Sequence, residues 1–391
     1  MQVDIAIIGA GPSGLCLAQA LSGCGLSIAV LERQPEAVLE NPPFDGREIA
    51  LTHLSAQRMR ELGLWERILP DAISPLRDAR VFNGTSLFAM NIDHSDGQKE
   101  ELGYLISNAI IRKAAYDVVK TSPDITLLTG IEISGILTNK QSARISLSDG
   151  RTIEAGLLIA ADSRYSETRR AMGISASTHD FGKTMMVCVM EHEVPHHQTA
   201  WEWFDYGQTL ALLPMNGMSS SVVVTLRPSE IQQLLSMPDE TFNRAIETRF
   251  KHRLGAMRVV STRHAYPLVT VYAERFMGER FALAGDAAVG MHPVTAHGFN
   301  FGLRSAHTLA CEIRTAHAHG ADIASAALLA RYEQKHRLAT RPLFLATHAI
   351  AKLYGNDTPP ARLLRQASLR LGNGIRPFKR AVAHMLTEAT S

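Results

Sequence analysis

Three glycines near the start of the chain place the strongest constraint on its fold. Gly9, Gly11 and Gly14 stand between the apolar run 3–8 and a segment of helical character. A short run that is apolar almost throughout is typical of a parallel strand buried on both faces. Gly9 permits a tight turn, Gly11 lets the backbone approach a pyrophosphate, and Gly14 lets the helix pack closely on the sheet. The pattern predicts a strand, a turn and a helix whose first N–H groups bind phosphate.

An acidic residue after the next apolar run completes this pattern. Residues 26–31 predict a second strand, and Glu32 and Arg33 follow it. Glu32 lies 21 residues beyond Gly11, where a carboxylate accepts hydrogen bonds from the hydroxyls of a ribose. Arg33 is a further candidate for cofactor binding. NAD and FAD both fit the arrangement, and a turn with a purely structural role is the alternative.

Two more acids stand where buried strands are predicted to end. Asp162 follows the apolar run 157–161, and Asp286 follows the run 281–284 and Gly285. Open α/β sheets bind ligands at the carboxyl ends of their strands, so both acids are candidate cofactor ligands. Either acid alone also fits an ordinary helix N-cap. The three clusters in this order are more specific than any one of them.

The composition is that of a globular protein with a large core. The chain has 391 residues, enough for two or three domains, and 46% of them are hydrophobic. Lys and Arg number 40 and Asp and Glu 38, so the chain is nearly neutral. A nearly neutral protein does not attract a nucleic-acid phosphate backbone strongly, and no nucleic-acid partner is expected. Four cysteines without a Cys-x-x-Cys pair suit a reducing compartment, and they predict neither a disulfide framework nor a metal site.

Two stretches bear on contact with a membrane. Residues 5–31 carry no charge and are long enough for a membrane helix, but early glycines favour a strand, a turn and a buried helix in a cytoplasmic protein. Residues 331–391 hold eleven basic and three acidic residues with leucines among them. Two interpretations stay open: a solvated helix packed on the domain, or a basic amphipathic surface that contacts anionic lipid at the inner membrane.

The order of the three clusters resembles that of the class A flavoprotein monooxygenases, which share the para-hydroxybenzoate hydroxylase fold. The likeness covers nearly the whole chain and implies that the dinucleotide is FAD. It also implies an α/β fold: a Rossmann-like FAD-binding domain of the glutathione-reductase type, an inserted antiparallel β-sheet substrate domain and a C-terminal helical segment. The residues that the resemblance assigns to FAD are Gly9, Gly11, Gly14, Glu32, Arg47, Arg112, Asp162, Gly285 and Asp286.

The resemblance and the strand pattern together predict a discontinuous domain organisation. Short runs between residues 185 and 226, separated by turn residues, are consistent with antiparallel strands. The expected parts are an FAD-binding domain (1–74, 101–175 and 276–345), a substrate domain (75–100 and 176–275) and a basic helical segment (346–391).

One segment is similar to a signature of the ubiquinone-biosynthesis hydroxylases. That signature reads His-Pro-x-x-Gly-Gln-Gly-x-Asn-x-Gly, and residues 292–302 read His-Pro-Val-Thr-Ala-His-Gly-Phe-Asn-Phe-Gly. Within this branch the chain resembles the demethoxyubiquinol hydroxylases. It departs from the pattern at Ser163, where glycine is usual, at Ala296 and His297, where Gly-Gln is usual, and at Ser305, where an acid is common. The departures suggest a distinct subgroup.

The resemblance implies an FAD-dependent monooxygenase that hydroxylates the ring of a polyprenylated phenol or quinol in ubiquinone biosynthesis. In that family, O2 and reduced FAD form a flavin hydroperoxide, and the electrons come from NAD(P)H or a protein donor. Pro293, His297 and Gly298 are the candidate catalytic residues, and Gly298 and Asn300 are also candidate FAD ligands. A helix that starts there would stabilise negative charge on the flavin. His297 is either a donor to the flavin or a spacer.

Several alternatives stay open from the sequence. The substrate is a prenylated ring or, alternatively, a soluble phenol or heterocycle. A further hypothesis is that the protein is no enzyme but a flavin-bearing accessory subunit without turnover. A ubiquinone-biosynthesis complex is a further expected partner. A set of apolar residues lines a substrate cavity or, alternatively, forms plain core. This set is Trp201, Trp203, Phe204, Leu210, Leu212, Pro214, Met215 and Met218.

Overall fold

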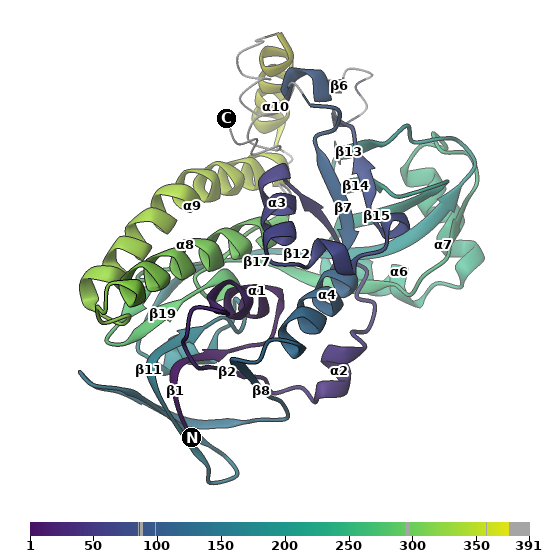
Figure 1. Ribbon diagram of the computed structural model, residues 1–391. Coiled ribbons are helices and arrows are strands. Elements are labelled where there is room, and N and C mark those ends of the chain that lie inside the picture. Colours follow the sequence, from purple (N-terminus) through teal and green to yellow (C-terminus); the bar gives the residue numbers. More distant parts are fainter. Residues whose placement is uncertain (85, 87–88, 98, 294–297, 357, 375–391) are drawn as a thin grey trace.

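Two large β-sheets and a small third one organise the molecule. The computed structural model describes residues 1–391 apart from 85, 87–88, 98, 294–297, 357 and 375–391 (Figure 1). The two large sheets are called here the first sheet and the second sheet, in the order in which the chain enters them.

The first sheet is built around β1 (Gln2–Ile8). This strand pairs in parallel with β11 (Thr152–Ala160) on one side and with β2 (Ile28–Leu31) on the other. The strand order is β18-β19-β11-β1-β2-β8, in which β18 runs antiparallel to β19, and a β9–β10 hairpin joins β11. The other strands are β8 (Ile125–Leu128), β9 (Ile133–Thr138), β10 (Ala143–Leu147), β18 (Met277–Gly278) and β19 (Phe281–Leu283). The inner part of β1 is buried on both faces, as its apolar run predicts.

Helices α1 (Pro12–Leu21), α4 (Asn108–Lys120) and α8 (Gly298–Ala318) cover one face of the first sheet (Figure 1). Helix α9 (Ala326–Gly355) packs along α8 and continues toward the second sheet. The shorter helices are α2 (Glu36–Glu40), α3 (His53–Glu61) and α5 (Glu167–Ala171). Single 3-10 turns are η1 (Trp65–Arg67), η2 (Pro70–Ala72), η3 (His94–Gly97) and η4 (Gly285–Ala287).

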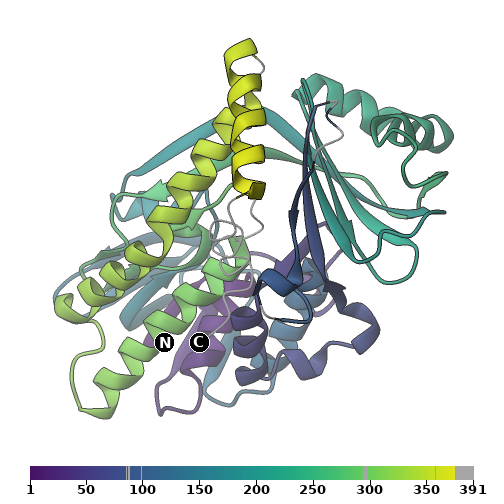
Figure 2. The same cartoon turned by 90° about the horizontal axis from the view of Figure 1, so that it is seen from above.

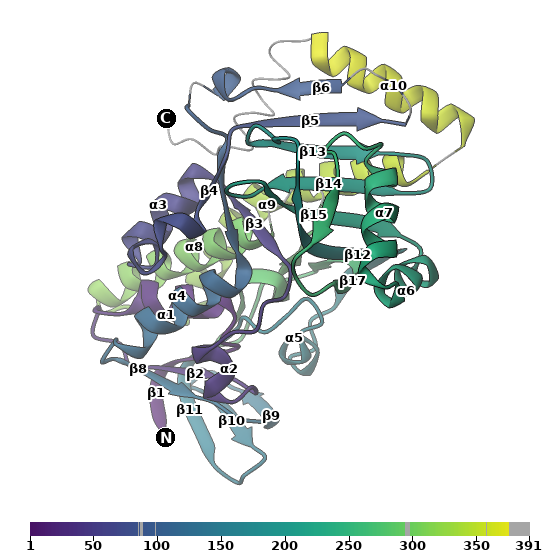
Figure 3. The ribbon, with the colours of Figure 1, turned by 90° about the vertical axis from the view of Figure 1, so that its right-hand side faces the viewer.

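The second sheet has the strand order β20-β17-β12-β15-β14-β13-β5-β6, and β16 joins β12. Neighbouring strands are antiparallel, as predicted, except for β13 and β5, which pair in parallel. Helices α6 (Pro228–Ser236) and α7 (Asp239–Arg249) cover its outer face (Figure 3). The strands are β5 (Asp78–Asn83), β6 (Ala89–Ile92), β12 (Ala176–His192), β13 (Thr199–Phe204), β14 (Thr209–Pro214), β15 (Ser219–Leu226), β16 (Met257–Val259), β17 (His264–Ala273) and β20 (Val289–Gly290).

The third sheet joins β3 (Glu48–Leu51), β7 (Gly103–Ser107) and β4 (Ser74–Leu76) and touches both larger units. Strand β3 contacts α8, and β4 contacts β14 of the second sheet. The last described helix, α10 (Pro359–Gly374), packs on β6 and on α9. Within the described residues, no helix is long and apolar enough to cross a membrane.

Candidate cofactor and substrate site

The glycine loop between β1 and α1 forms a cradle that is open in front of Gly11. Gly9 has a φ of +108°, which residues with a side chain rarely adopt. A Cβ atom on Gly14 would lie 2.0 Å from the carbonyl oxygen of Gly9, so the helix start and the turn approach too closely for any other residue. A Cβ atom on Gly11 would meet nothing within 4 Å, and no described side chain caps α1. The loop leaves room and N–H donors for phosphate.

Glu32 holds its carboxylate beside this loop. Its Oε2 accepts a hydrogen bond from the backbone N–H of Ala10 (2.8 Å), and its Oε1 accepts one from the N–H of Gln34 (2.8 Å). The parallel pairing of β1 with β2 brings these strand ends together. Each carboxylate oxygen has capacity for a further donor, such as a ribose hydroxyl. Arg33, next in the chain, is exposed.

The acids of the other two clusters follow neighbouring strands, because β11 and β19 pair in parallel. Asp286 is partly exposed, and its Oδ2 accepts a hydrogen bond from Nη2 of Arg164 at 3.1 Å. Oδ2 of Asp162 accepts a bond from the N–H of Thr168 (3.3 Å) in the first turn of α5. Its Oδ1 is buried without a partner among the described residues. Asp162 therefore supports a helix start and keeps one oxygen for a ligand.

The Gly285 turn packs directly against the first turn of α1. A Cβ atom on Gly285 would lie 2.9 Å from Ser13, and one on Gly302 in α8 would lie 2.2 Å from Oγ of Ser13. Oγ of Ser305, a departure from the pattern noted above, accepts the N–H of Gly285 (2.9 Å) and so fixes the turn. Three segments that are far apart in the chain thus converge at Ser13.

The loop before β3 brings Arg47 against the second sheet. Nη2 of Arg47 lies 2.6 Å from Oδ2 of Asp45, and the guanidinium lies 5.3 Å from the ring centre of Tyr266 in β17. Tyr266 donates its hydroxyl to the carbonyl oxygen of Asp45 (2.7 Å). Burial raises the pKa of Tyr266, and Arg47 and Arg112 of α4 act against that rise. Both predicted arginines therefore lie near one ring at the junction of the sheets.

Asn300 ties the start of α8 to the third sheet. Its Nδ2 donates to the carbonyl oxygen of Ala50 (2.8 Å), and its Oδ1 accepts the N–H of Thr52 (3.2 Å). These bonds make it a residue that positions the helix. Gly298 is the first residue of α8, and a Cβ atom there would meet nothing within 4 Å. The start of α8 is thus held in place with open space beside it.

Pro293, His297 and His292 are the other residues of interest just before α8. Pro293 is exposed, and His297 lies outside the described residues. His292 is largely buried, and burial, with smaller contributions from His348 and Arg164, lowers its pKa to about 4. His292 is therefore neutral at physiological pH.

Sequence reasoning missed a buried carboxyl next to Arg47. Burial raises the pKa of Glu48 to about 8, and the charge of Asp45 adds to the rise. Oε1 of Glu48 and Oγ of Ser107, opposite it on β7, are buried with no partner in the described chain. The available signal was a glutamate that begins an otherwise apolar strand. The unpaired atoms suit a polar ligand at this junction.

Several residues of the predicted apolar cavity pack on the outer face of the second sheet. Trp203, Leu210 and Leu212 belong to the core between this sheet and helices α6 and α7, so the plain-core alternative holds for them. Phe204 points to the opposite, inner face and packs on Tyr354 of α9, with ring centres 4.0 Å apart. Figure 2 shows the sheet between α6 and α7 on one side and α9 and α10 on the other.

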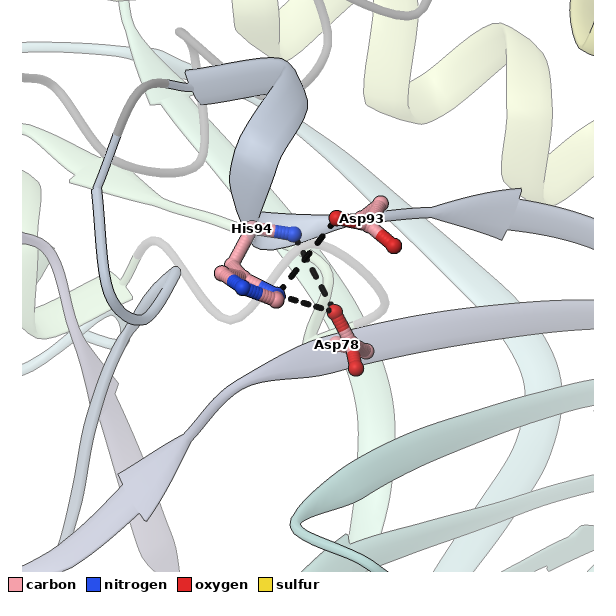
Figure 4. A group of neighbouring side chains, drawn as sticks. All are labelled: Asp78, Asp93 and His94. Carbon is pink, nitrogen blue, oxygen red and sulfur yellow. Dashed lines mark hydrogen bonds and ion pairs between the residues drawn. The ribbon is translucent and has the colours of Figure 1, made fainter.

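A separate group of ionisable side chains lies on β5 and after β6 (Figure 4). Oδ1 of Asp78 accepts hydrogen bonds from the backbone N–H (3.1 Å) and from Nδ1 (2.9 Å) of His94. Oδ1 of Asp93 lies 3.4 Å from the same ring nitrogen. Because these atoms bond to one another, the group ties η3 to β5.

The residues at the junction fit FAD. The open cradle at Gly11 suits its pyrophosphate, Glu32 suits a ribose, and the partly exposed Asp286 suits the hydroxyls of the ribityl chain. Oδ1 of Asp162, which is unpaired among the described residues, can accept a hydrogen bond from a ligand at the same end of the strands. An FAD site on the first sheet with a second sheet beside it is the arrangement that the resemblance to FAD-dependent monooxygenases predicts.

Comparison with known proteins agrees with this class. The profile of the family described as "FAD binding domain" matches residues 2–344. The chain is 46% identical to ubiquinone hydroxylase UbiM of Neisseria meningitidis over 98% of its own length and 84% of that protein. It is 36% identical to ubiquinone hydroxylase UbiL of Rhodospirillum rubrum over 96% of its own length and 87% of that protein. The chain belongs to this FAD-binding family.

A solved structure supports the fold. The p-nitrophenol 4-monooxygenase PnpA of Pseudomonas putida superimposes with a TM-score of 0.79 at 18% identity, over 99% of this chain and 98% of that one. The predicted family, the α/β fold with its FAD-binding domain, the cofactor FAD and the enzyme class of FAD-dependent aromatic hydroxylases are confirmed. The domain boundaries and the individual site residues stay predictions.

Proposed function

We propose that the chain hydroxylates the aromatic ring of a polyprenylated phenol or quinol in ubiquinone biosynthesis. Two observations support the proposal. The chain is 46% identical to a ubiquinone hydroxylase over nearly its full length, and three segments that suit FAD converge at Ser13. NAD(P)H or a protein as electron donor, and membership of a ubiquinone-biosynthesis complex, belong to the same proposal.

The residues divide the work of the site. When bound and reduced, FAD supplies the activated oxygen. The α1 start at Gly11 would bind the pyrophosphate, Glu32 would orient a ribose, and Asp286 would orient the ribityl chain. The N–H groups at the α8 start, beside Gly298, would stabilise negative charge on the flavin. The loop holding Arg47 contacts Tyr266 and so ties the first part of the chain to the second sheet at the junction.

Asp286→Ala is expected to weaken FAD binding by about 10- to 100-fold, since one hydrogen bond to a charged group contributes about 1.5–3 kcal/mol. The fold should persist, because Asp286 is partly exposed and its ion pair within the described residues is with Arg164. Fluorescence titration of the FAD-free protein with FAD measures the change. Asp322→Ala, which removes a comparable ion pair with Arg280, is the control. Equal affinities in both variants would remove Asp286 from the site.

Oxygen uptake by the purified protein with a prenylated phenol tests the proposed function. The expected result is uptake coupled to a product that carries one more hydroxyl group. Coupled uptake with a soluble phenol or heterocycle alone would support the second candidate substrate class. Tight FAD binding without coupled uptake on either would support the accessory subunit.

The C-terminal helices give the membrane proposal a specific surface. Two bases of α10 hold the helix to the body: Arg365 is buried and donates to the carbonyl oxygen of Leu353 (3.0 Å), and Arg362 lies over the ring of Tyr206. These two bases therefore pack α10 on the body of the protein, which is what the interpretation of the C-terminal segment as a helix packed on the domain expects.

Helix α9 instead presents apolar and basic residues together. Leu338 is 71% and Leu345 56% exposed, and Arg341 and Lys352 are exposed at positions that share their face. We propose that this surface contacts anionic lipid and brings the enzyme to a prenylated substrate.

Replacing Leu338 and Leu345 together by serine is expected to lower binding to anionic vesicles by about tenfold or more, because their apolar surface no longer enters the interface. Flotation with vesicles that contain acidic phospholipid measures it. Leu137→Ser removes a leucine of similar exposure (72%) from β9 and should have no effect. Unchanged flotation of the double variant at unchanged FAD content would contradict the proposal.

A further inference from the structure

The second sheet turns one continuous row of side chains toward its inner face. Strand pairing aligns Val187 of β12 with Val223 of β15, then Ala211 of β14, then Glu202 of β13, then Val81 of β5. Side chains alternate along a strand, and the neighbours of Glu202, Trp201 and Trp203, pack on the outer core. Glu202 therefore belongs to the inner face, where its neighbours in the row are apolar.

This row extends from the cofactor junction to the C-terminal helices. At one end, a Cβ atom on Gly46, next to Arg47, would lie 2.7 Å from a methyl group of Val187. At the other end, Val81 packs in a small core with Phe204 and Tyr354 of α9. Three strand spacings, about 14 Å, separate Val187 from Glu202. A molecule beside the junction would have to extend about 14 Å along the inner face to reach Glu202.

The carboxyl of Glu202 is half-buried, and within the described chain no hydrogen bond or ion pair holds it. Its neighbours in the row, Ala211 and Val81, are apolar, and burial raises its pKa to about 8. Other polar atoms of the inner face share this lack of partners. Oγ of Ser221 and Oδ1 of Asn83 are buried and unpaired in the described chain. Unsatisfied polar groups on an apolar wall are typical of a surface that binds a polar group of a ligand.

We propose that Glu202 is a catalytic residue that accepts the proton of the substrate's phenolic hydroxyl. The proposal deepens the proposed function and rests on it. In this step the O–H bond of the phenol breaks, its electron pair stays on the oxygen, and the proton bonds to a carboxylate oxygen of Glu202. The resulting phenolate is richer in electrons at the ring carbons that receive the oxygen atom from the FAD-dependent reaction. When the ring carbon that received the oxygen loses its proton to water, the C–H electron pair restores the aromatic ring, and Glu202 returns its proton to the phenol oxygen.

The surroundings of Glu202 suit a proton acceptor at mildly alkaline pH. Among the described residues, the titratable or charged groups of the helices packed on this sheet include Tyr354 of α9 and Arg365 of α10, both at the Phe204 end. They also include His348 of α9, whose ring centre lies 4.8 Å from that of His179 in β12. The carboxylate form grows as the pH rises toward 8 and beyond, so the rate should rise with it. A general base of this kind contributes about 10²- to 10⁴-fold to the rate.

The test compares two ligands and two variants of the FAD-loaded protein. The ligands are a phenol with one short prenyl chain and its methyl ether, which lacks the proton. Change in flavin absorbance on titration gives the dissociation constants at pH 6 and pH 9. The wild type is expected to prefer the phenol by about 10- to 100-fold at pH 9 and less at pH 6. Glu202→Gln should remove this preference and lower kcat/KM by about 10²- to 10⁴-fold.

Glu191→Gln, in β12 of the same sheet, is the matched control because Glu191 is a surface residue paired with Arg258. It should behave as the wild type. A Glu202→Gln protein that keeps both the preference and the rate would overturn the role of Glu202 and leave the proposed function intact. A wild type that binds both ligands equally at pH 9 would overturn it as well. A wild type that binds neither ligand and hydroxylates no phenol would overturn the role and the proposed function together.

Discussion

Gly11→Val is expected to give a folded protein that binds no FAD. A Cβ atom on Gly11 would meet no protein atom within 4 Å, so the valine side chain enters the open space in front of α1 without disturbing the protein's own packing. That space is where the pyrophosphate would lie against the N–H groups of the helix. The substitution therefore removes the ligand and spares the fold.

Two measurements on the Gly11→Val protein separate these effects. Flavin content after incubation with FAD should fall to background, whereas circular dichroism and the thermal unfolding of the FAD-free protein should match those of the FAD-free wild type. A variant that keeps a full flavin complement would show that the cradle at Gly11 does not hold the pyrophosphate.

Gly14→Ala is expected to destabilise the protein itself. The new Cβ atom would lie 2.0 Å from the carbonyl oxygen of Gly9, a backbone atom that β1 and the turn hold in place. Overpacking of this kind costs about 1–3 kcal/mol or more, because the helix has to move off the sheet. The loss should appear with and without FAD.

The matched control is Gly11→Ala, a change of the same size at the N-cap of the same helix. Thermal unfolding of both variants in their FAD-free forms should give a clearly lower Tm for Gly14→Ala and a Tm close to wild type for Gly11→Ala. Equal Tm values would mean that α1 does not approach Gly9 as closely as the structure has it.

The parts of the site that the sequence predicted are those that local patterns encode. A strand followed by a glycine turn and a helix depends on neighbouring residues. Gly9 and Gly11 lie in the turn between β1 and α1, and Gly14 lies in the first turn of the helix. Acids after β11 and β19 could be placed at one sheet edge because parallel strands end on the same side.

The missed features depend on pairing between distant segments. Glu48 and Ser107 meet only because β3 pairs with β7, and the register of β13 decides which face Glu202 takes. The sequence predicts that the tryptophans on either side of Glu202 line a cavity or form plain core, and in the structure α6 and α7 cover the face to which they point. An apolar side chain alone does not tell which face of a sheet will be covered.

The absorption spectrum of the purified full-length chain tests the central claim most directly, namely that the segments converging at Ser13 hold one FAD. The account predicts the two visible bands of a bound flavin and, after saturation with FAD and gel filtration, one flavin per chain. A colourless protein that takes up no FAD under these conditions would contradict it.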